Sequence, residues 1–286
     1  MSKNKFDKIY IEVTNICNLN CSFCHKTKRK QKYMEVKEFE EIIEKIKEHT
    51  DLVFLHVTGE PLLSPHLEEM LNICYKNNMK VNITTNGTLL KQKKEIIKKA
   101  KSLRQLNISL HSYTENKGMS NTYLKETIET VNEISEENDI YISYRLWNLE
   151  DISKNSDNKE ILQELEKLYK MQNLIEKAKN NKSIELAKKI FLNQDIKFTW
   201  PDINGNKINC EGKCYGLRKQ IAILVNGDIV PCCLDAEGEI ILGNIHKENI
   251  SEILNKKTAI EMKKGFEQGE LTQDLCKTCG FIKKFN

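Results

Sequence analysis

The sequence contains no apolar run long enough to cross a membrane. Its longest apolar runs are of the kind seen at Ile221–Val225, whereas a membrane-spanning helix needs ~20 apolar residues. It also has no apolar secretory segment after Met1. These absences argue against a helical membrane protein and against a secreted one, and we expect a cytoplasmic protein.

The sequence also lacks a large excess of positive or negative charge. The chain has 45 basic and 41 acidic residues, a net charge of +4, and it lacks the basic runs that mark a nucleic-acid-binding surface. The one dense basic block is Lys26–Lys32. Its composition fits a solvated loop or a patch that attracts an anionic substrate, and it gives weak support to contact with RNA.

Internal repeats and low-complexity segments are absent, and 286 residues allow a barrel-sized domain with an appendage. From residue 8 to 146, short β-branched runs alternate with amphipathic patterns. Strands are expected at Lys8–Thr14, Leu52–Val57, Lys80–Thr85, Gln105–Leu110 and Ile140–Leu146. Helices are expected at Val36–Glu48, Pro65–Asn77, Lys91–Lys101 and Thr122–Glu137. Repeated β-then-α units predict a parallel sheet with outer helices, either a barrel or a doubly wound sheet.

The rest of the chain predicts a second domain. The region of about residues 150–196 is expected to be mainly helical: Asp151–Lys159 is polar and turn-like, and two helices are expected from Glu160 to about Asn193. A short final strand is expected at Asp195–Trp200. Asp, Asn, Gly and Pro concentrate at Pro201–Asn209 and predict a boundary. Beyond it, Ile221–Val225 and Asp228–Val230 flank Asn226-Gly227, a strong hairpin signal. We therefore expect domains at residues 1–204 and 205–286.

The ten cysteines are expected to be metal ligands or buried thiols, because disulfides are rare in a reducing compartment. Cys17, Cys21 and Cys24 follow the first expected strand with three and two residues between them. Three thiolates can hold three corners of a cubane iron–sulfur cluster and leave its fourth iron without a protein ligand. An open coordination position on a metal is where a small molecule binds and reacts.

This triplet, with Phe23 before its last cysteine and His25 after it, resembles the fingerprint of the radical S-adenosylmethionine (radical SAM) superfamily. The resemblance implies an α/β fold, a partial (β/α)6 TIM-type barrel. It also implies a [4Fe-4S] cluster on Cys17, Cys21 and Cys24 that binds S-adenosylmethionine (SAM). Such a cluster cleaves SAM to a 5′-deoxyadenosyl radical, which abstracts hydrogen from a substrate.

The same resemblance implies further cofactor-binding residues. Thr58-Gly59-Glu60-Pro61 stands where the family has a Gly-Gly-Glu-Pro segment that holds the methionyl amino group, and Thr58 departs from that pattern. Glycine lets a backbone approach a ligand closely, and a carboxylate can accept hydrogen bonds from an ammonium. The full set of expected cofactor contacts is Phe23, Gly59, Glu60, Pro61, Thr85, Asn86, Ser109 and Arg145. An ordinary strand-to-helix loop at Pro61 and an ordinary turn at Asn86 are the alternatives.

The C-terminal cysteines resemble the SPASM/Twitch extension of radical SAM enzymes. Cys214, Cys232, Cys276 and Cys279, at separations of 18, 44 and 3 positions, suit an auxiliary [4Fe-4S] cluster with four thiolate ligands. Cys210 is a rival or additional ligand. Zinc is the alternative metal, since four thiolates also make a structural zinc site. Of the remaining cysteines, Cys74 is expected to be a packed thiol on a helix, and Cys233 to point into the core.

The resulting hypothesis is a radical SAM enzyme that oxidises or modifies a small molecule or peptide with help from the auxiliary cluster. Its reducing partner is expected to be of the flavodoxin or ferredoxin type. Catalytic residues stay open, with Cys210 and His111 as candidates, and no motif names the substrate. An RNA-modifying radical SAM enzyme and a non-enzymatic zinc-binding adaptor are the alternatives.

Overall fold

The computed structural model describes residues 5–116, 122–148, 156–208 and 211–284. The chain forms two compact units. Unit 1 comprises residues 1–16, 25–81 and 198–286, and unit 2 comprises residues 17–24 and 82–197. Within the described ranges, no helix is both long and apolar enough to cross a bilayer.

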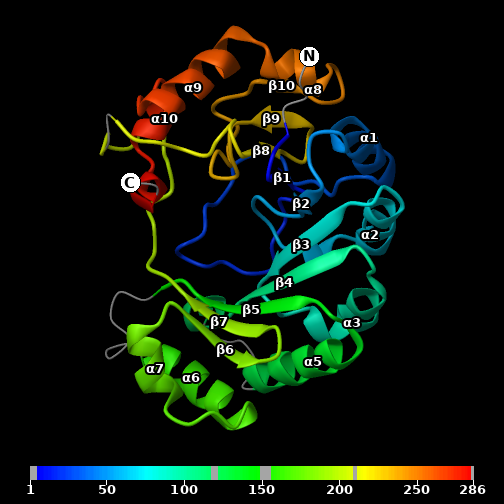
Figure 1. The fold of residues 1–286 in the computed structure, drawn as a ribbon, viewed down its shortest axis with the longest axis vertical. Helices are drawn as coiled ribbons and strands as arrows, with labels where there is room; N and C mark the ends of the chain where they lie inside the picture. Colours follow the sequence, from blue (N-terminus) through cyan, green and yellow to red (C-terminus); the bar gives the residue numbers. More distant parts are fainter. Residues whose placement is uncertain (1–4, 117–121, 149–155, 209–210, 285–286) are drawn as a thin grey trace. The chain divides into compact units, whose positions relative to one another are not determined.

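The sheet of unit 1 joins the beginning of the chain to its C-terminal part (Figure 1). Strand β1 (Lys8–Ile11) pairs in parallel with β2 (Leu52–Phe54) on one side and with β8 (Gln220–Ile223) on the other. Antiparallel pairing then adds β9 (Asp228–Val230) and β10 (Gly243–Asn244). A core cluster forms where these strands meet, from Tyr10, Val57, Ala222, Leu224, Val230 and Ala236.

The helices of unit 1 pack through apolar stripes. Helix α1 (Val36–Ile46) buries Phe39, Ile42, Ile43 and Ile46, the i, i+3, i+4 and i+7 positions of an amphipathic helix, and it packs against α2 (Leu67–Lys76). The other helical elements of this unit are the 3₁₀ turn η1 (Pro61–Leu63), α8 (Ile250–Leu254), α9 (Lys257–Gln268), α10 (Asp274–Lys277) and η2 (Gly280–Lys284).

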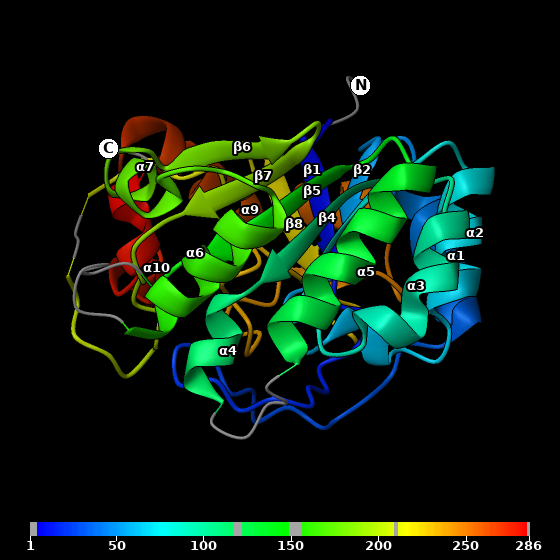
Figure 2. The ribbon, with the colours of Figure 1, turned by 90° about the horizontal axis from the view of Figure 1, so that it is seen from below.

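Unit 2 is also built of strands and helices. Strands β4 (Leu103–Ser109), β5 (Tyr141–Leu146) and β7 (Ile190–Gln194) are parallel, and β6 (Ser183–Ala187) closes the edge antiparallel to β7. Helices α5 (Tyr123–Glu137) and α6 (Ser156–Leu168) lie on the same face of these strands (Figures 1 and 2). Unit 2 also holds α3 (Leu90–Lys99), α4 (His111–Glu115) and α7 (Leu174–Asn180), and β3 (Lys80–Thr85) runs across the boundary between the units.

The expected alternation of strands and helices up to residue 146 is confirmed, and the mixed α/β architecture with parallel pairing agrees with the predicted fold class. The helical stretch expected from about residue 150 to 196 is correct for α6 and α7 but wrong for residues 183–194. Those residues form the β6–β7 hairpin, in which burial alternates with period two along β7. Residues 149–155 of that stretch lie outside the described residues.

The final strand expected at Asp195–Trp200 is also wrong. The last parallel strand of unit 2 is β7, which ends at Gln194, and no strand forms over residues 195–200. Parallel pairing with β5 explains the difference, because it satisfies the backbone groups of Ile190–Gln194.

Candidate functional site

The cysteine loop is closed at its base by hydrogen bonds within unit 1. Met34 N donates to Val13 O (2.9 Å), and Thr14 Oγ1 donates to Lys32 O (3.0 Å). The Asn15 side chain donates to Lys30 O (2.9 Å) and accepts from Lys32 N (2.8 Å). These bonds join the residues before Cys17 to those after Cys24 without any metal, so the ends of the loop are fixed by the polypeptide itself.

The Gly59-Glu60-Pro61 segment lies against the start of this loop. Glu60 N donates to Ile16 O (2.8 Å), one residue before Cys17. Gly59 has φ +73°, and a Cβ there would overlap Thr14 O and stand 3.0 Å from Asn15 C and Cα. Glu60 is 2% exposed, and its carboxylate accepts from Leu62 N (3.0 Å), which caps η1 with Pro61 at its first position. Gly59 thus lets this segment approach the backbone of the loop base closely, and its predicted approach to a ligand stays a prediction.

The cysteine triplet itself belongs to unit 2, where amide groups surround its sulfurs. Asn116 Nδ2 lies 3.1 Å from Cys21 Sγ, Leu19 N donates to Cys17 Sγ at 3.4 Å, and Asn86 Nδ2 lies 3.9 Å from Cys17 Sγ. Donors aimed at sulfur suit thiolate ligands, and hydrogen bonds of this kind set the reduction potential of an iron–sulfur cluster. The donor set therefore fits an iron–sulfur cluster on this loop.

Helix α4 and its neighbours hold the middle of the loop. The Glu115 carboxylate accepts hydrogen bonds from the Ser22 hydroxyl and from Ser22 N (3.3 Å), and it pairs with Lys197 (3.3 Å). The Ser22 hydroxyl and Lys197 together lower the pKa of Glu115 despite its partial burial. The ring of Phe23 packs against the His111 ring in a tilted arrangement, with ring centroids 4.6 Å apart. The aromatic residue of the fingerprint thus has a specific packing partner.

His111 is neutral at pH 7 in this environment. Burial lowers its pKa to about 4, and the nearby Arg145 and Lys197 charges act in the same direction. Its Nδ1 faces Arg145 O at 3.0 Å, so that nitrogen carries the proton. A neutral His111 imidazole between the Arg145 carbonyl and the Phe23 ring is suited to a packing role. An acid–base role for His111 stays a prediction.

The strand ends of unit 2 bring several predicted residues together. Ser109 and Arg145 are opposite each other in the β4–β5 register. Arg145 Nη1 lies 3.4 Å from Thr84 Oγ1, and its guanidinium stacks on Trp147 at 4.7 Å. After β3, the Asn86 side chain donates to Asn18 Oδ1 (2.9 Å), and Thr85 Oγ1 accepts from Gly87 N (3.0 Å).

The C-terminal cysteines of unit 1 form a second group. Cys214, Cys232, Cys276 and Cys279 come from three segments, and a negative charge on Cys214 would raise the pKa of each of the other three thiols. Burial is the largest cause of the raised pKa at all four. A bound cation would favour the thiolate form of these four sulfurs, so the donor set fits a four-thiolate metal centre.

The structure does not place either cysteine group in metal-binding geometry. Among the described residues, no three His, Cys, Asp or Glu side chains stand at the spacing of a bound ion. Gly216 N donates to Cys214 Sγ (3.3 Å), the kind of backbone contact that supports a thiolate ligand. The four cysteine thiols and the Gly216 N donor agree with the predicted four-thiolate centre, whose alternative metals are iron and zinc.

The remaining cysteines divide as follows. Cys74 is fully buried on α2, and burial raises its pKa strongly, so it is a packed thiol. Cys233 packs against the unit 1 core cluster, and burial raises its pKa to about 11. Both observations agree with the expectations for these cysteines. Cys210 lies outside the described residues.

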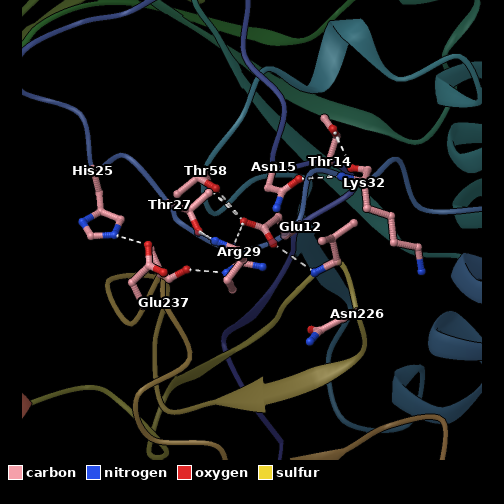
Figure 3. A network of polar contacts seen from close by, with 12 residues as sticks. Glu12, Thr14, Asn15, His25, Thr27, Arg29, Lys32, Thr58, Asn226 and Glu237 are labelled. Atoms are coloured by element: carbon pink, nitrogen blue, oxygen red, sulfur yellow. Dashed lines mark hydrogen bonds and ion pairs between the residues drawn. The ribbon is translucent and has the colours of Figure 1, made fainter.

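Sequence reasoning missed the polar network that surrounds the loop base (Figure 3). Its centre is Glu12, which is fully buried at the end of β1 and pairs with Arg29 (Nη2–Oε1 2.7 Å). Glu237 accepts from His25 Nε2 (2.7 Å) and from Lys28 N (3.0 Å). A carboxylate in an otherwise apolar strand was the available signal for Glu12. The sequence carries no comparable signal for Asn116 or Glu237.

Comparison with known proteins decides the family. The model of the radical SAM superfamily matches residues 11–155, just over half of the chain. The chain belongs to the radical SAM superfamily. The model of an iron–sulfur cluster-binding domain, SPASM, matches residues 214–280. Members of this superfamily are enzymes, and the two domains together imply SAM and iron–sulfur clusters as cofactors, as the sequence predicted.

Solved structures share the radical SAM fold. The structure of BtrN in complex with AdoMet and 2-DOIA aligns over 97% of this chain and 94% of that chain, with TM-score 0.62 and 17% identity. Streptococcus suis SuiB bound to S-adenosylmethionine aligns over 98% and 72%, with TM-score 0.60 and 16% identity. At these identities the likeness establishes the fold and confirms the predicted class.

Curated relatives match a shorter part of this radical SAM protein. A probable GTP 3′,8-cyclase of Methanococcus maripaludis is 30% identical over 104 residues, 35% of each chain. The GTP 3′,8-cyclase of Clostridium botulinum is 31% identical over 125 residues, 41% of this chain and 39% of that protein. The chain therefore spans little more than a third of the length of these relatives.

The Gly59 contacts generate a prediction. Gly59→Ala should lower the urea midpoint of the metal-free protein more than backbone strain alone does, because a Cβ there meets Thr14 and Asn15 backbone atoms. The left-handed conformation by itself costs about 1–2 kcal/mol for a residue other than glycine. Urea unfolding followed by circular dichroism measures the loss.

Gly269→Ala is the matched control. Gly269 has φ +82° with nothing within 4 Å of the added Cβ, so its substitution carries the strain without the clash. We expect the midpoint to fall at least about twice as far for Gly59→Ala as for Gly269→Ala. Equal losses would contradict the close approach of Gly59 to the loop base.

Proposed function

We propose that this radical SAM protein cleaves SAM at a [4Fe-4S] cluster held by Cys17, Cys21 and Cys24, and that the 5′-deoxyadenosyl radical takes hydrogen from a small molecule or peptide. The observation that carries the proposal is the set of amide donors directed at Cys17 and Cys21 sulfur. When bound and reduced, the cluster supplies the electron that breaks the SAM sulfonium bond. Cys74 is buried on α2, which makes it unsuitable as a fourth ligand.

The cofactor contacts in unit 1 follow from the family pattern. Gly59, Glu60 and Pro61 would contact the methionyl amino group, with Glu60 as the anionic partner of the ammonium. Support comes from the rigidity of this segment, since Glu60 N bonds to Ile16 O and the Glu60 side chain caps η1. A segment held in this way is already organised for a ligand, which lowers the ordering cost of binding.

The contacts proposed in unit 2 are Phe23, Thr85, Asn86, Ser109 and Arg145. Ser109 is proposed as a ribose contact and Arg145 as a bidentate partner of the SAM carboxylate. Their positions at the ends of β4 and β5 support this assignment, because the carboxyl ends of parallel strands are where ligands bind in α/β folds. Phe23 would border the cofactor while its ring rests on His111.

The auxiliary [4Fe-4S] cluster is proposed on Cys214, Cys232, Cys276 and Cys279, in a domain covering residues 205–286. Its support is that a charge on Cys214 would raise the pKa of Cys232, Cys276 and Cys279, so these thiols lie near one another, and that all four fall inside the matched SPASM region. Such a cluster would accept the electron of a substrate radical or bind substrate directly. The domain of residues 1–204 would then carry the SAM chemistry. Cys210 stays a proposed additional ligand or hydrogen donor.

The substrate is proposed to be a small molecule or a peptide. Among the structures with this fold, one holds AdoMet and 2-DOIA, one holds the precursor peptide SuiA and one holds AdoMet with the Kp18Cys peptide. A flavodoxin or ferredoxin in the cytoplasm is the proposed electron source. Radical modification of RNA rests on the Lys26–Lys32 block alone, and a zinc-binding adaptor would purify colourless with zinc in place of iron.

Removal of Cys17 tests the catalytic cluster. Cys17→Ala, purified without oxygen, should contain about four irons per chain where the parent contains about eight, and it should form no 5′-deoxyadenosine from SAM. Iron analysis and chromatography of the reaction mixture measure the two effects. SAM cleavage at the parent rate would contradict the assignment of the triplet.

Removal of Cys276 tests the auxiliary cluster. Cys276→Ala should also lose about four irons per chain, yet it should still cleave SAM slowly in the absence of substrate, since the triplet is intact. Turnover of the true substrate should stop. Cys74→Ala is the control, because its thiol lies in the α2 core, and it should keep the full iron content. Normal substrate turnover by Cys276→Ala would show that the second cluster is dispensable.

A further inference from the structure

The residue that departs from the family pattern, Thr58, makes a contact that glycine cannot make. Its hydroxyl donates to Glu12 Oε1 at 2.6 Å, and its backbone N donates to the same oxygen at 3.3 Å. Both residues are buried, Thr58 at 5% and Glu12 at 0% exposure. A glycine there would keep the backbone contact and lose the stronger, hydroxyl one.

Among the residues that the structure describes, three separate segments donate hydrogen bonds to the Glu12 carboxylate. Besides Thr58, Arg29 Nη2 donates to Oε1 (2.7 Å) and Val225 N donates to Oε2 (3.0 Å). An ionised carboxylate only accepts hydrogen bonds, and each of its two oxygens has a donor. Figure 3 shows Thr58 and Arg29 converging on this carboxylate.

Arg29 carries the connection further into the C-terminal part of unit 1. Its Nε donates to Ala236 O at 2.8 Å while its Nη2 holds Glu12. Val225 and Ala236 lie on either side of Cys232 in the sequence, and both contact this pair. The guanidinium fork makes the two contacts at once, which a lysine ammonium on a flexible stem does not reproduce.

We propose that Glu12 is a positioning residue for the cofactor: through Thr58 and Arg29 it fixes the Thr58–Pro61 segment and ties it to the hairpin that leads to Cys232. This inference rests on the proposed role of Gly59 and Glu60 in SAM binding. The affinity for SAM then depends on the hydrogen bond between Thr58 and Glu12, which makes no contact with SAM itself. Thr58 stands where the family has its first glycine, and its hydroxyl supplies the hydrogen bond to Glu12.

Thr58→Val tests the proposal, because it keeps the shape and removes the hydroxyl. The dissociation constant of SAM, measured by calorimetry on the anaerobic protein with both clusters, should rise about tenfold, the size expected for one hydrogen bond to a charged group. Thr58→Ser restores the donor and should stay within about twofold of the parent. In SAM cleavage without substrate, Thr58→Val should raise KM for SAM and leave kcat nearly unchanged.

Thr50→Val is the matched control. Thr50 is a buried threonine of unit 1 whose hydroxyl donates to Leu52 O at 3.1 Å, away from the Glu12 network. It should bind SAM as the parent does, and all these variants should hold the parental iron content. Unchanged SAM affinity in Thr58→Val, or an equal loss in Thr50→Val, would overturn the proposal.

Arg29→Lys provides a second test if Thr58→Val fails to fold. It keeps the positive charge beside Glu12 but loses the simultaneous contact with Ala236 O, so SAM affinity should fall by about tenfold at unchanged iron content. Parental affinity in this variant would also overturn the positioning role. Failure of the parent protein itself to bind SAM would instead refute the proposed function, which keeps the two failures distinct.

Discussion

The buried carboxylate of Glu12 is the constraint on which the rest of unit 1 depends. It accepts hydrogen bonds from Thr58, from Arg29 and from Val225 N. Removing one partner of a buried ion pair typically costs about 3–5 kcal/mol, since the other charge is left without compensation. Such a penalty keeps three segments in one arrangement. The base of the cysteine loop is built on this arrangement, with further bonds from Thr14 and Asn15.

The two cysteine groups sit in different surroundings, and the difference matches different tasks. Cys17 is exposed, and amide donors contact the sulfurs of Cys17 and Cys21, which suits a cluster that meets an exogenous ligand. The four C-terminal cysteines are each half-buried, and loss of hydration is the largest cause of the raised pKa at all four thiols. A ligand set shielded from water in this way suits a closed centre that changes only its electron count.

Sequence patterns predicted the main strands and helices up to residue 146 because each has a clear period. They failed at β7, whose pairing with β5 depends on the sheet and on nothing local. The cysteines and Gly59 were recognisable from spacing. Glu12, Arg29 and Asn116 were not, because a buried ion pair and an amide aimed at sulfur arise only when distant segments meet.

The central claim is that the cluster on Cys17, Cys21 and Cys24 has an iron open to SAM. Electron paramagnetic resonance of reduced, oxygen-free Cys276→Ala protein tests it most directly, since only that cluster should then contribute to the spectrum. The account predicts that adding SAM changes the g values of the cubane signal, because the cofactor becomes a ligand of the open iron. A cubane spectrum that stays the same at saturating SAM would contradict it.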